Sequence, residues 1–399
     1  MNLLKIVIKK VNDVVVIEKS WDWPTLILYV LLAITIMFLS MASIKAKKQN
    51  ERIKIKKINI EKKYIYYVMI YIVFILFSTF RVVSNGIGGT DTITYIEHFK
   101  NMKYVRFFSI ANLTLNDFEY LYYNLMYVVK LCGGAYINFE FLIHSSIIIS
   151  YIYIIDKCLN EPKSSVVVIL FFIPLLKSLN IIRNCFAACL GCVGLEKVNE
   201  NKKVAGVLLI LAAFLSHYMA IVLFVFLLFN KFFPNNWINK KTEILLPIVC
   251  LLMGALSLPI IKVLIGHSGF SGYLNKIQVS LLGYVPIITL YLVMIFTDDF
   301  KNYVIKNKHY VYFKAHIFMI SILPITIMIG AASRVMLFFE IPKYILYSDL
   351  FVIYRNKINN KTAYDVIVIL SLIIWLIFRI YRMWNGYGLM PYKNKLFNW

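Results

Sequence analysis

The stretch Tyr64–Val83 reads YIYYVMIYIVFILFSTFRVV and decides the fold class. It is a nearly unbroken apolar run with the length that an α-helix needs to cross a bilayer, about 20 residues. At Arg81 the sequence turns polar, and Phe77–Phe99 (FSTFRVVSNGIGGTDTITYIEHF) contains three glycines, an aspartate and a glutamate. A soluble protein lacks the polar surface to cover such runs. The pattern therefore predicts a membrane-spanning helix that ends in a polar loop.

Similar apolar runs recur along the 399 residues, of which 60% are hydrophobic. They predict an all-α, polytopic integral membrane protein with about 11–13 transmembrane or half-membrane helices. We expect an N-terminal basic interfacial segment (1–22) and a single polytopic transmembrane domain (23–384) with an extracytoplasmic loop at 85–117. A short C-terminal tail (385–399) would follow.

The formal net charge of +23 does not indicate nucleic-acid binding, because the cations lie mainly in short loops between apolar runs. Cations in such positions set membrane topology and contact anionic lipid headgroups. Ile44–Lys63 holds nine Lys and Arg residues against two glutamates. This loop is predicted to be cytoplasmic, which places Arg81 at the extracytoplasmic end of the next span.

Three cysteines, Cys185, Cys189 and Cys192, recur at helical spacing and raise the possibility of a metal or redox cluster. The same stretch is rich in alanine and glycine, and small residues on one face let transmembrane helices approach closely. No CxxC pair accompanies the cysteines. Packing is therefore the favoured interpretation.

Six ionisable residues within or beside apolar runs are candidates for chemistry, because such groups are costly in a membrane. They are Arg81, Asp91, Arg183, His217, Arg334 and Glu340, of which Glu340 could simply pair with Lys343 on one helix. Each also has an ordinary explanation: an arginine can extend to the interface or cap a span, and a histidine can be a packing residue. Together they suit a substrate with phosphates and hydroxyls, since arginines bind phosphate oxygens bidentately and a carboxylate accepts a hydroxyl proton.

The segment Val204–Phe229 leaves the topology open. Counting simple crossings from the Ile44–Lys63 loop puts Arg183 inside and Asn199–Lys203 outside. If Lys202 and Lys203 are cytoplasmic, Arg183 lies outside instead. In the second case the segment forms two half-helices that meet at His217, each too short to cross. Broken helices are tolerated where they line a polar cavity.

Short blocks in a fixed order make the chain similar to the EpsG/Wzy family of bacterial surface polysaccharide polymerases. Arg81–Tyr95 has the pattern R-x7-G-T-D-x3-Y, in which the glycine is Gly89. Asn180–Ala188 resembles the family's arginine-then-small-residue helix, with Asn184 where a glutamine is common. Further matching blocks are Asp117-Phe118-Glu119, Asn199–Lys203, Ala212–His217, Ser333-Arg334 and Pro391-Tyr392.

The resemblance implies a membrane glycosyltransferase of the bacterial inner membrane that makes O-antigen, capsule or exopolysaccharide. It would transfer a growing glycan from undecaprenyl diphosphate to a sugar hydroxyl of the next lipid-linked repeat unit. Asp91 would be the base, with His217 as a second candidate or an orienting group. Arg81, Arg183 and Arg334 would contact phosphate or glycan, and the other expected substrate contacts are Gly89, Tyr95 and Glu119.

No cofactor and no metal is expected, because arginines can replace a cation at the diphosphate. Expected partners are the bilayer, the lipid-linked oligosaccharide, a flippase and a chain-length regulator, and no nucleic acid. Two alternatives remain open: a lipid-linked oligosaccharide flippase or transporter, and another polyprenyl-phosphate-dependent glycosyltransferase or ligase.

Overall fold

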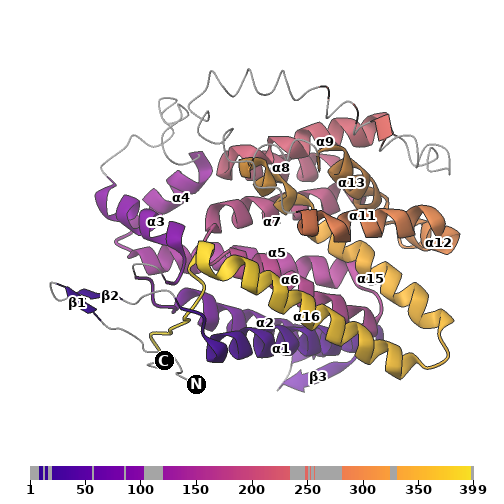
Figure 1. Cartoon of the computed structure of the whole chain (residues 1–399), viewed down its shortest axis with the longest axis horizontal. Coiled ribbons are helices and arrows are strands. Elements are labelled where there is room, and N and C mark those ends of the chain that lie inside the picture. The colour runs from indigo at the N-terminus through magenta and orange to yellow at the C-terminus, as the bar shows by residue number, and fades with distance from the viewer. Residues whose placement is uncertain are drawn as a thin grey trace. The chain divides into compact units, whose positions relative to one another are not determined.

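The computed structural model describes residues 9–11, 14–16, 20–55, 58–84, 87–102, 120–233, 248–249, 252, 256, 281–323 and 330–396. Helices account for most of these residues, and the strands form two short antiparallel pairs, β1–β2 and β3–β4 (Figure 1). The predicted all-α class is confirmed. The predicted limits of the three segments, 1–22, 23–384 and 385–399, are not tested by the structure and stay a prediction.

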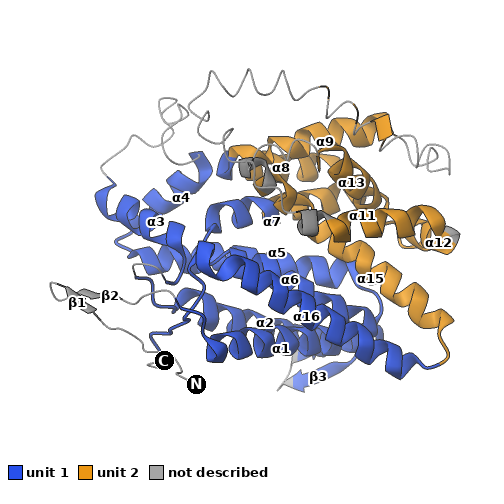
Figure 2. Cartoon of the chain, in the orientation of Figure 1, with its two compact units in different colours: residues 1–189, 215–217, 360–399 blue, residues 190–214, 218–359 orange. Residues whose placement is uncertain are grey.

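The chain groups into two compact units (Figure 2). Unit 1 contains residues 1–189, 215–217 and 360–399, and unit 2 contains 190–214 and 218–359. In unit 1 lie β1 (Lys9–Val11), β2 (Val14–Val16), α1 (Trp23–Lys48), β3 (Arg52–Ile55), β4 (Ile58–Glu61), α2 (Lys62–Thr79), α3 (Thr90–Asn101), α4 (Tyr120–Leu131), α5 (Tyr136–Cys158), η2 (Pro162–Val167), α6 (Val168–Lys177), the start of α7 (Ile182–Asn199), and α16 (Lys361–Tyr387). Unit 2 holds the rest of α7, most of α8 (Lys203–Ser216), η3 (Tyr218–Ala220), α9 (Ile221–Phe232), α11 (Leu281–Phe296), α12 (Asp298–Lys306), α13 (Tyr310–Ser321), η6 (Gly330–Phe339) and α15 (Glu340–Lys357).

Helices α1, α2 and α5 form the framework that supports the candidate site. Asp22 caps the start of α1 by accepting a hydrogen bond of 2.9 Å from the Thr25 amide, a usual N-cap contact. Lysines fill the last turn of α1, where cations complement the helix dipole. The β3–β4 pair then reverses the chain into α2, which packs against both α1 and α5.

Two carboxylates of α5 pair with cations at opposite ends of this framework. Glu140 lies 2.6 Å from Arg81. Asp156 lies 3.4 Å from Lys47 and accepts a 2.8 Å hydrogen bond from Tyr67. Sixteen residues of helix separate the two carboxylates, about 24 Å at 1.5 Å per residue. The polar ends are thus spaced nearly as far apart as the faces of a bilayer's hydrocarbon core.

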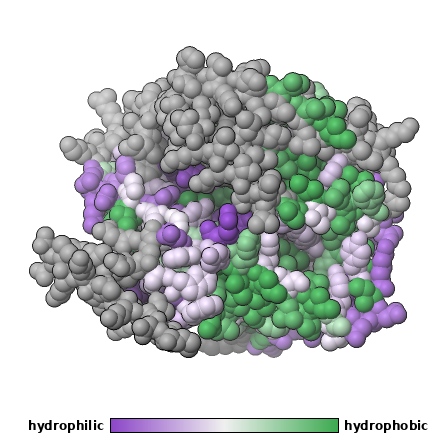
Figure 3. Space-filling view, viewed as in Figure 1, coloured by the Kyte–Doolittle hydropathy of each residue, from purple (hydrophilic) through white to green (hydrophobic). Residues whose placement is uncertain are grey.

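Among the described helices, α1, α2, α5 and α16 are long and apolar enough to cross a membrane. Shorter apolar helices occupy Lys203–Ser216, Tyr218–Phe232 and Val285–Phe296. Large apolar side chains of α16 are exposed, including Ile367 (62%) and Ile374 (67%), and Figure 3 shows hydrophobic residues gathered over this helix. Such a surface suits lipid contact, so the chain is a membrane protein.

Small residues of α7 bring neighbouring helices of unit 2 close together. A Cβ on Gly194 would lie 2.9 Å from Ile210 of α8, and one on Gly191 would lie 2.4 Å from Leu223 of α9. Side chains at these positions would therefore push the helices apart. Cys185, Cys189 and Cys192 are buried on the same helix and form no disulfide within the described part of the chain.

Removing one partner of the buried pair formed by His309 and Asp349 in unit 2 is expected to destabilise the fold far more than breaking an exposed pair does. His309 Nδ1 lies 2.7 Å from Asp349 Oδ2, and both side chains are buried. His309→Ala leaves the Asp349 carboxylate buried without its partner, so the free energy of unfolding should fall by about 3–5 kcal/mol. Thermal unfolding in detergent measures the change. Lys357→Ala breaks the exposed Lys357–Asp299 pair and should leave the melting temperature unchanged; equal losses in the two variants would contradict this account.

Candidate active site

The polar stretch after α2 is built around the buried side chain of Arg81, which is 1% exposed. The Arg81 guanidinium forms an ion pair with Glu140 and donates hydrogen bonds to three backbone carbonyls and one hydroxyl. The hydrogen-bond acceptors are Gly88 O (2.8 Å), Ser78 O, Leu179 O (2.9 Å) and Thr92 Oγ1 (3.3 Å). Arg81 therefore joins the end of α2, the glycine turn, α3, α5 and the loop before α7.

Glycine is required twice in the turn that Arg81 organises. Gly88 has φ +75° and Gly89 has φ +108°, backbone conformations that other residues rarely adopt. A Cβ on Gly89 would lie 2.1 Å from the Leu179 carbonyl oxygen, and one on Gly88 would lie 2.2 Å from Val82 O. The glycines thus allow the backbone to approach its neighbours closely enough for the carbonyls to reach Arg81.

Asp91 lies in the first turn of α3, directly after this glycine turn. The side chain of Asn180 holds the helix start, because its Oδ1 accepts hydrogen bonds from the Asp91 amide (2.7 Å) and the Thr90 hydroxyl (3.0 Å). Within the described part of the chain, the half-buried Asp91 carboxylate makes no hydrogen bond and no ion pair. Its oxygens are therefore available to a ligand.

Tyr95 links Asp91 to Arg183. Tyr95 is one helical turn further along α3 and on the same face as Asp91. The Arg183 guanidinium carbon lies 6.0 Å from the Tyr95 ring centroid, within the range of a cation–π contact. Arg183 is therefore at the Arg81 end of unit 1. Of the two topologies left open by the sequence, this favours the one with Arg81 and Arg183 on one membrane face.

The C-terminal tail, Leu389–Leu396, closes the same end of unit 1. Backbone hydrogen bonds join Val82 N to Lys393 O and Lys395 N to Phe80 O, each 2.8 Å long, on either side of Arg81. The Tyr392 hydroxyl donates a 2.7 Å hydrogen bond to Phe77 O. Burial raises the pKa of Tyr392 to about 12, so this hydroxyl stays protonated and remains a donor at neutral pH.

His217 lies at the break between α8 and α9, as the two-half-helix interpretation predicts. Helix α8 has 14 residues and α9 has 12, about 21 and 18 Å, so neither can cross a bilayer alone. The rings of Phe214 and Phe224, ten residues apart, lie 6.2 Å apart, which shows that the chain reverses at the break. The buried His217 belongs to unit 1.

The other two predicted site residues are not placed beside Asp91. Arg334 lies in η6 of unit 2, half-buried, and its side chain makes no hydrogen bond or ion pair within the described residues. Segment η6 packs against η3, which directly follows the break at His217. Glu119 and residues 85–86 and 103–117 of the predicted loop lie outside the described residues.

Three contributors to the site were missed by the sequence analysis: Glu140, Asn180 and the tail. Glu140 carries the one signal that could have revealed it, since it is a carboxylate within an apolar run and such groups need a partner. Asn180 was noted only as part of a family block. Among the described residues, no group of three or more His, Cys, Asp and Glu side chains could hold a metal ion.

Replacing Gly89 should damage the site without removing any side chain from it. Gly89→Ala places a Cβ against the Leu179 carbonyl in a left-handed backbone conformation, and the strain should cost about 1–3 kcal/mol. Gly386→Ala is the matched control, because a Cβ there meets nothing within 4 Å. We expect Gly89→Ala to lower the thermal unfolding temperature and the activity, and Gly386→Ala to retain both. A fully stable and active Gly89→Ala variant would show that the close approach is not required.

Comparison with known proteins gives one match. The model of the EpsG family matches residues 64–394, from the start of α2 to Asn394 in the tail, and this range includes every candidate site residue. No curated protein and no solved structure matches. Because the match covers most of the sequence, the chain belongs to the EpsG family, a Wzy-like family of polysaccharide polymerases.

Proposed function

We propose that this protein is a membrane glycosyltransferase that polymerises a surface polysaccharide. Membership of the EpsG family supports a polysaccharide polymerase-type function. The proposed donor is a growing glycan attached to undecaprenyl diphosphate. The proposed acceptor is a sugar hydroxyl of the next lipid-linked repeat unit, on the outer leaflet of the bacterial inner membrane.

One observation carries the proposal: the unpartnered carboxylate of Asp91 shares a face of α3 with Tyr95, and the guanidinium of Arg183 contacts the Tyr95 ring. A free carboxylate at the first turn of a helix can accept a proton from a bound hydroxyl. A guanidinium forms charge-assisted, bidentate hydrogen bonds with phosphate oxygens. The two groups fit an acceptor hydroxyl and a diphosphate leaving group, respectively.

In the proposed step, the acceptor hydroxyl oxygen attacks the anomeric carbon of the donor sugar. The Asp91 carboxylate takes the hydroxyl proton as the new glycosidic bond forms. The bond between the anomeric carbon and the diphosphate oxygen breaks, and its electron pair leaves with undecaprenyl diphosphate. Arg183 stabilises the negative charge that develops on this leaving group, an interaction worth a few kcal/mol in the transition state.

Arg81 has a different role in this proposal from the phosphate contact predicted from sequence. Its guanidinium is surrounded by protein acceptors and is almost fully buried. We therefore assign Arg81 as a positioning residue that holds the turn before Asp91. Tyr95 would orient Arg183 through the contact between ring and guanidinium.

His217 and Arg334 are proposed to complete the machinery. His217 would orient the acceptor or serve as a second base, and Arg334 and Glu119 would contact the glycan or phosphate. A flippase that delivers the repeat units and a regulator of chain length are the proposed protein partners. No metal or other cofactor takes part in the proposed step.

A reconstituted system tests the proposal against the alternatives. Purified protein in liposomes receives a fluorescent lipid-linked repeat unit, and product length and leaflet distribution are both measured. A polymerase yields a ladder of longer lipid-linked glycans. A flippase moves the label between leaflets without lengthening it, and a ligase gives single transfers; either result would overturn the proposal.

A further inference from the structure

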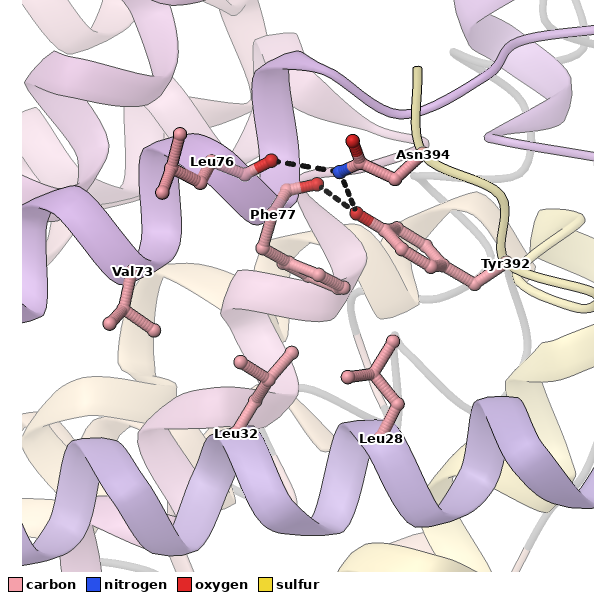
Figure 4. A pocket seen from close by; sticks show the side chains of 7 residues that line it. All are labelled: Leu28, Leu32, Val73, Leu76, Phe77, Tyr392 and Asn394. Carbon is pink, nitrogen blue, oxygen red and sulfur yellow. Dashed lines mark hydrogen bonds between the residues drawn. The ribbon is translucent and has the colours of Figure 1, made fainter. Parts of the chain in front are cut away.

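An apolar groove of about 420 Å³ lies between α1, α2 and the C-terminal tail (Figure 4). Its volume is within the range of ligand pockets, about 300–1,000 Å³. Leu32 of α1 and Val73 of α2 point into it from facing helices. The remaining lining residues are Leu28, Leu76, Phe77, Tyr392 and Asn394.

The few polar groups of this groove are already engaged within the protein. The Asn394 amide donates hydrogen bonds to Leu76 O (3.0 Å) and to the Tyr392 hydroxyl (2.8 Å), and the Tyr392 hydroxyl donates to Phe77 O. These two carbonyls are among the last four of α2, and the last four carbonyls of a helix have no hydrogen-bond partner within it. The groove therefore offers an occupant only apolar contacts, and such a groove suits a hydrocarbon chain.

Two lysines lie next to the groove in the tail. Lys393 and Lys395 flank the lining residue Asn394, and neither forms an ion pair within the described part of the chain. The backbone of both lysines is tied to Phe80 and Val82, on either side of Arg81. Positive charge beside an apolar groove complements a lipid with an anionic headgroup.

The groove also lies at the correct end of the bundle for the candidate site. Its α2 residues, Val73 to Phe77, occupy the last two turns before Arg81, far from the basic β3–β4 end. A headgroup beside Lys393 and Lys395 would lie next to the turn that leads to Asp91. We propose that this groove binds the isoprenoid chain of the polyprenyl diphosphate lipid, with the two lysines at its diphosphate.

The choice of a polyprenyl lipid rests on the proposed function. The test therefore measures lipid binding and does not depend on enzymatic turnover. The probe is polyprenyl diphosphate with a photoreactive diazirine in its chain, added to the protein in nanodiscs. Mass spectrometry should map cross-links to peptides containing Leu28–Leu32 and Val73–Phe77. Unlabelled polyprenyl diphosphate should compete, and phosphatidylglycerol at the same concentration should not. Cross-links elsewhere, or equal competition by phosphatidylglycerol, would overturn the inference.

Paired substitutions on one helix distinguish the effect of filling the groove from a general loss of protein stability. Leu32→Trp fills the groove and should reduce cross-linking on the order of tenfold. Leu31→Trp is the control, because Leu31 is 56% exposed and is not a lining residue; it should cross-link as the wild type does. Val73→Trp and its exposed neighbour Ile72→Trp repeat the comparison on α2. Equal cross-linking in the filled and control variants would refute the site.

The outcome is independent of the polymerase test. A protein that cross-links in the groove and makes no polymer would retain the lipid site and lose the proposed function. A protein that makes polymer without cross-links in the groove would retain the function and lose the lipid site.

Discussion

Asp91→Asn is expected to lower the polymerisation rate by about 10²–10⁴-fold, the usual contribution of a general base. The amide keeps the shape of the side chain but cannot take the acceptor proton. Because the helix start is held by Asn180 through the Asp91 backbone amide, the variant should fold and reach the membrane normally. Cells that carry it should show surface glycans of one or a few repeat units on gels.

Glu97→Gln provides the matched control for this substitution. Glu97 is an exposed carboxylate on the same helix, α3, outside the cluster of Asp91, Tyr95 and Arg183. Its loss should leave the length distribution unchanged. Normal-length polymer from Asp91→Asn would remove Asp91 from the reaction and leave it as a residue of the turn.

The second large effect is a contrast between two arginines that look alike in the sequence. Arg183→Ala should leave the fold intact and lower the rate by about 10²–10³-fold, because a group that stabilises the leaving diphosphate is lost. Arg81→Ala should instead lower the free energy of unfolding by about 3–5 kcal/mol, because Glu140 is left buried without its partner. Protein abundance in the membrane, thermal unfolding and activity per folded molecule are measured for both.

Arg52→Ala is the reference for the arginine variants, since Arg52 is exposed on β3 at the opposite end of α2. It should match the wild type in stability and rate. A stable but inactive Arg81→Ala protein would contradict the positioning role and would indicate that Arg81 contacts the substrate directly. An Arg183→Ala protein with normal turnover would remove Arg183 from the site.

Local features of the sequence predicted much of this arrangement. The length of the apolar runs predicted the fold class, and the break at His217 was one of the two interpretations left open for Val204–Phe229. Asp91 and Tyr95 lie on one face of α3, a helix within the 85–117 segment that was predicted as a loop. The fold class and the break were predictable because each depends on residues close together in the chain.

The features that were not predicted depend on contacts between distant residues. Arg81 pairs with Glu140, 59 positions later, and the tail returns more than 300 positions to meet α2. Charge counting could not decide the side of Arg183, which is set by the contacts of Leu179 and Asn180 with the Arg81 turn. A single sequence indicates that a buried charge needs a partner but does not identify that partner.

The most direct test of the central claim is the stoichiometry of lipid release during elongation. Purified protein in liposomes is given lipid-linked repeat units, with the Asp91→Asn variant in parallel. Glycan length and free polyprenyl diphosphate are quantified together. The account predicts a ladder in which each added unit releases one polyprenyl diphosphate, with neither product from Asp91→Asn. Unchanged glycan length across several lipid compositions, or lengthening without diphosphate release, would contradict it.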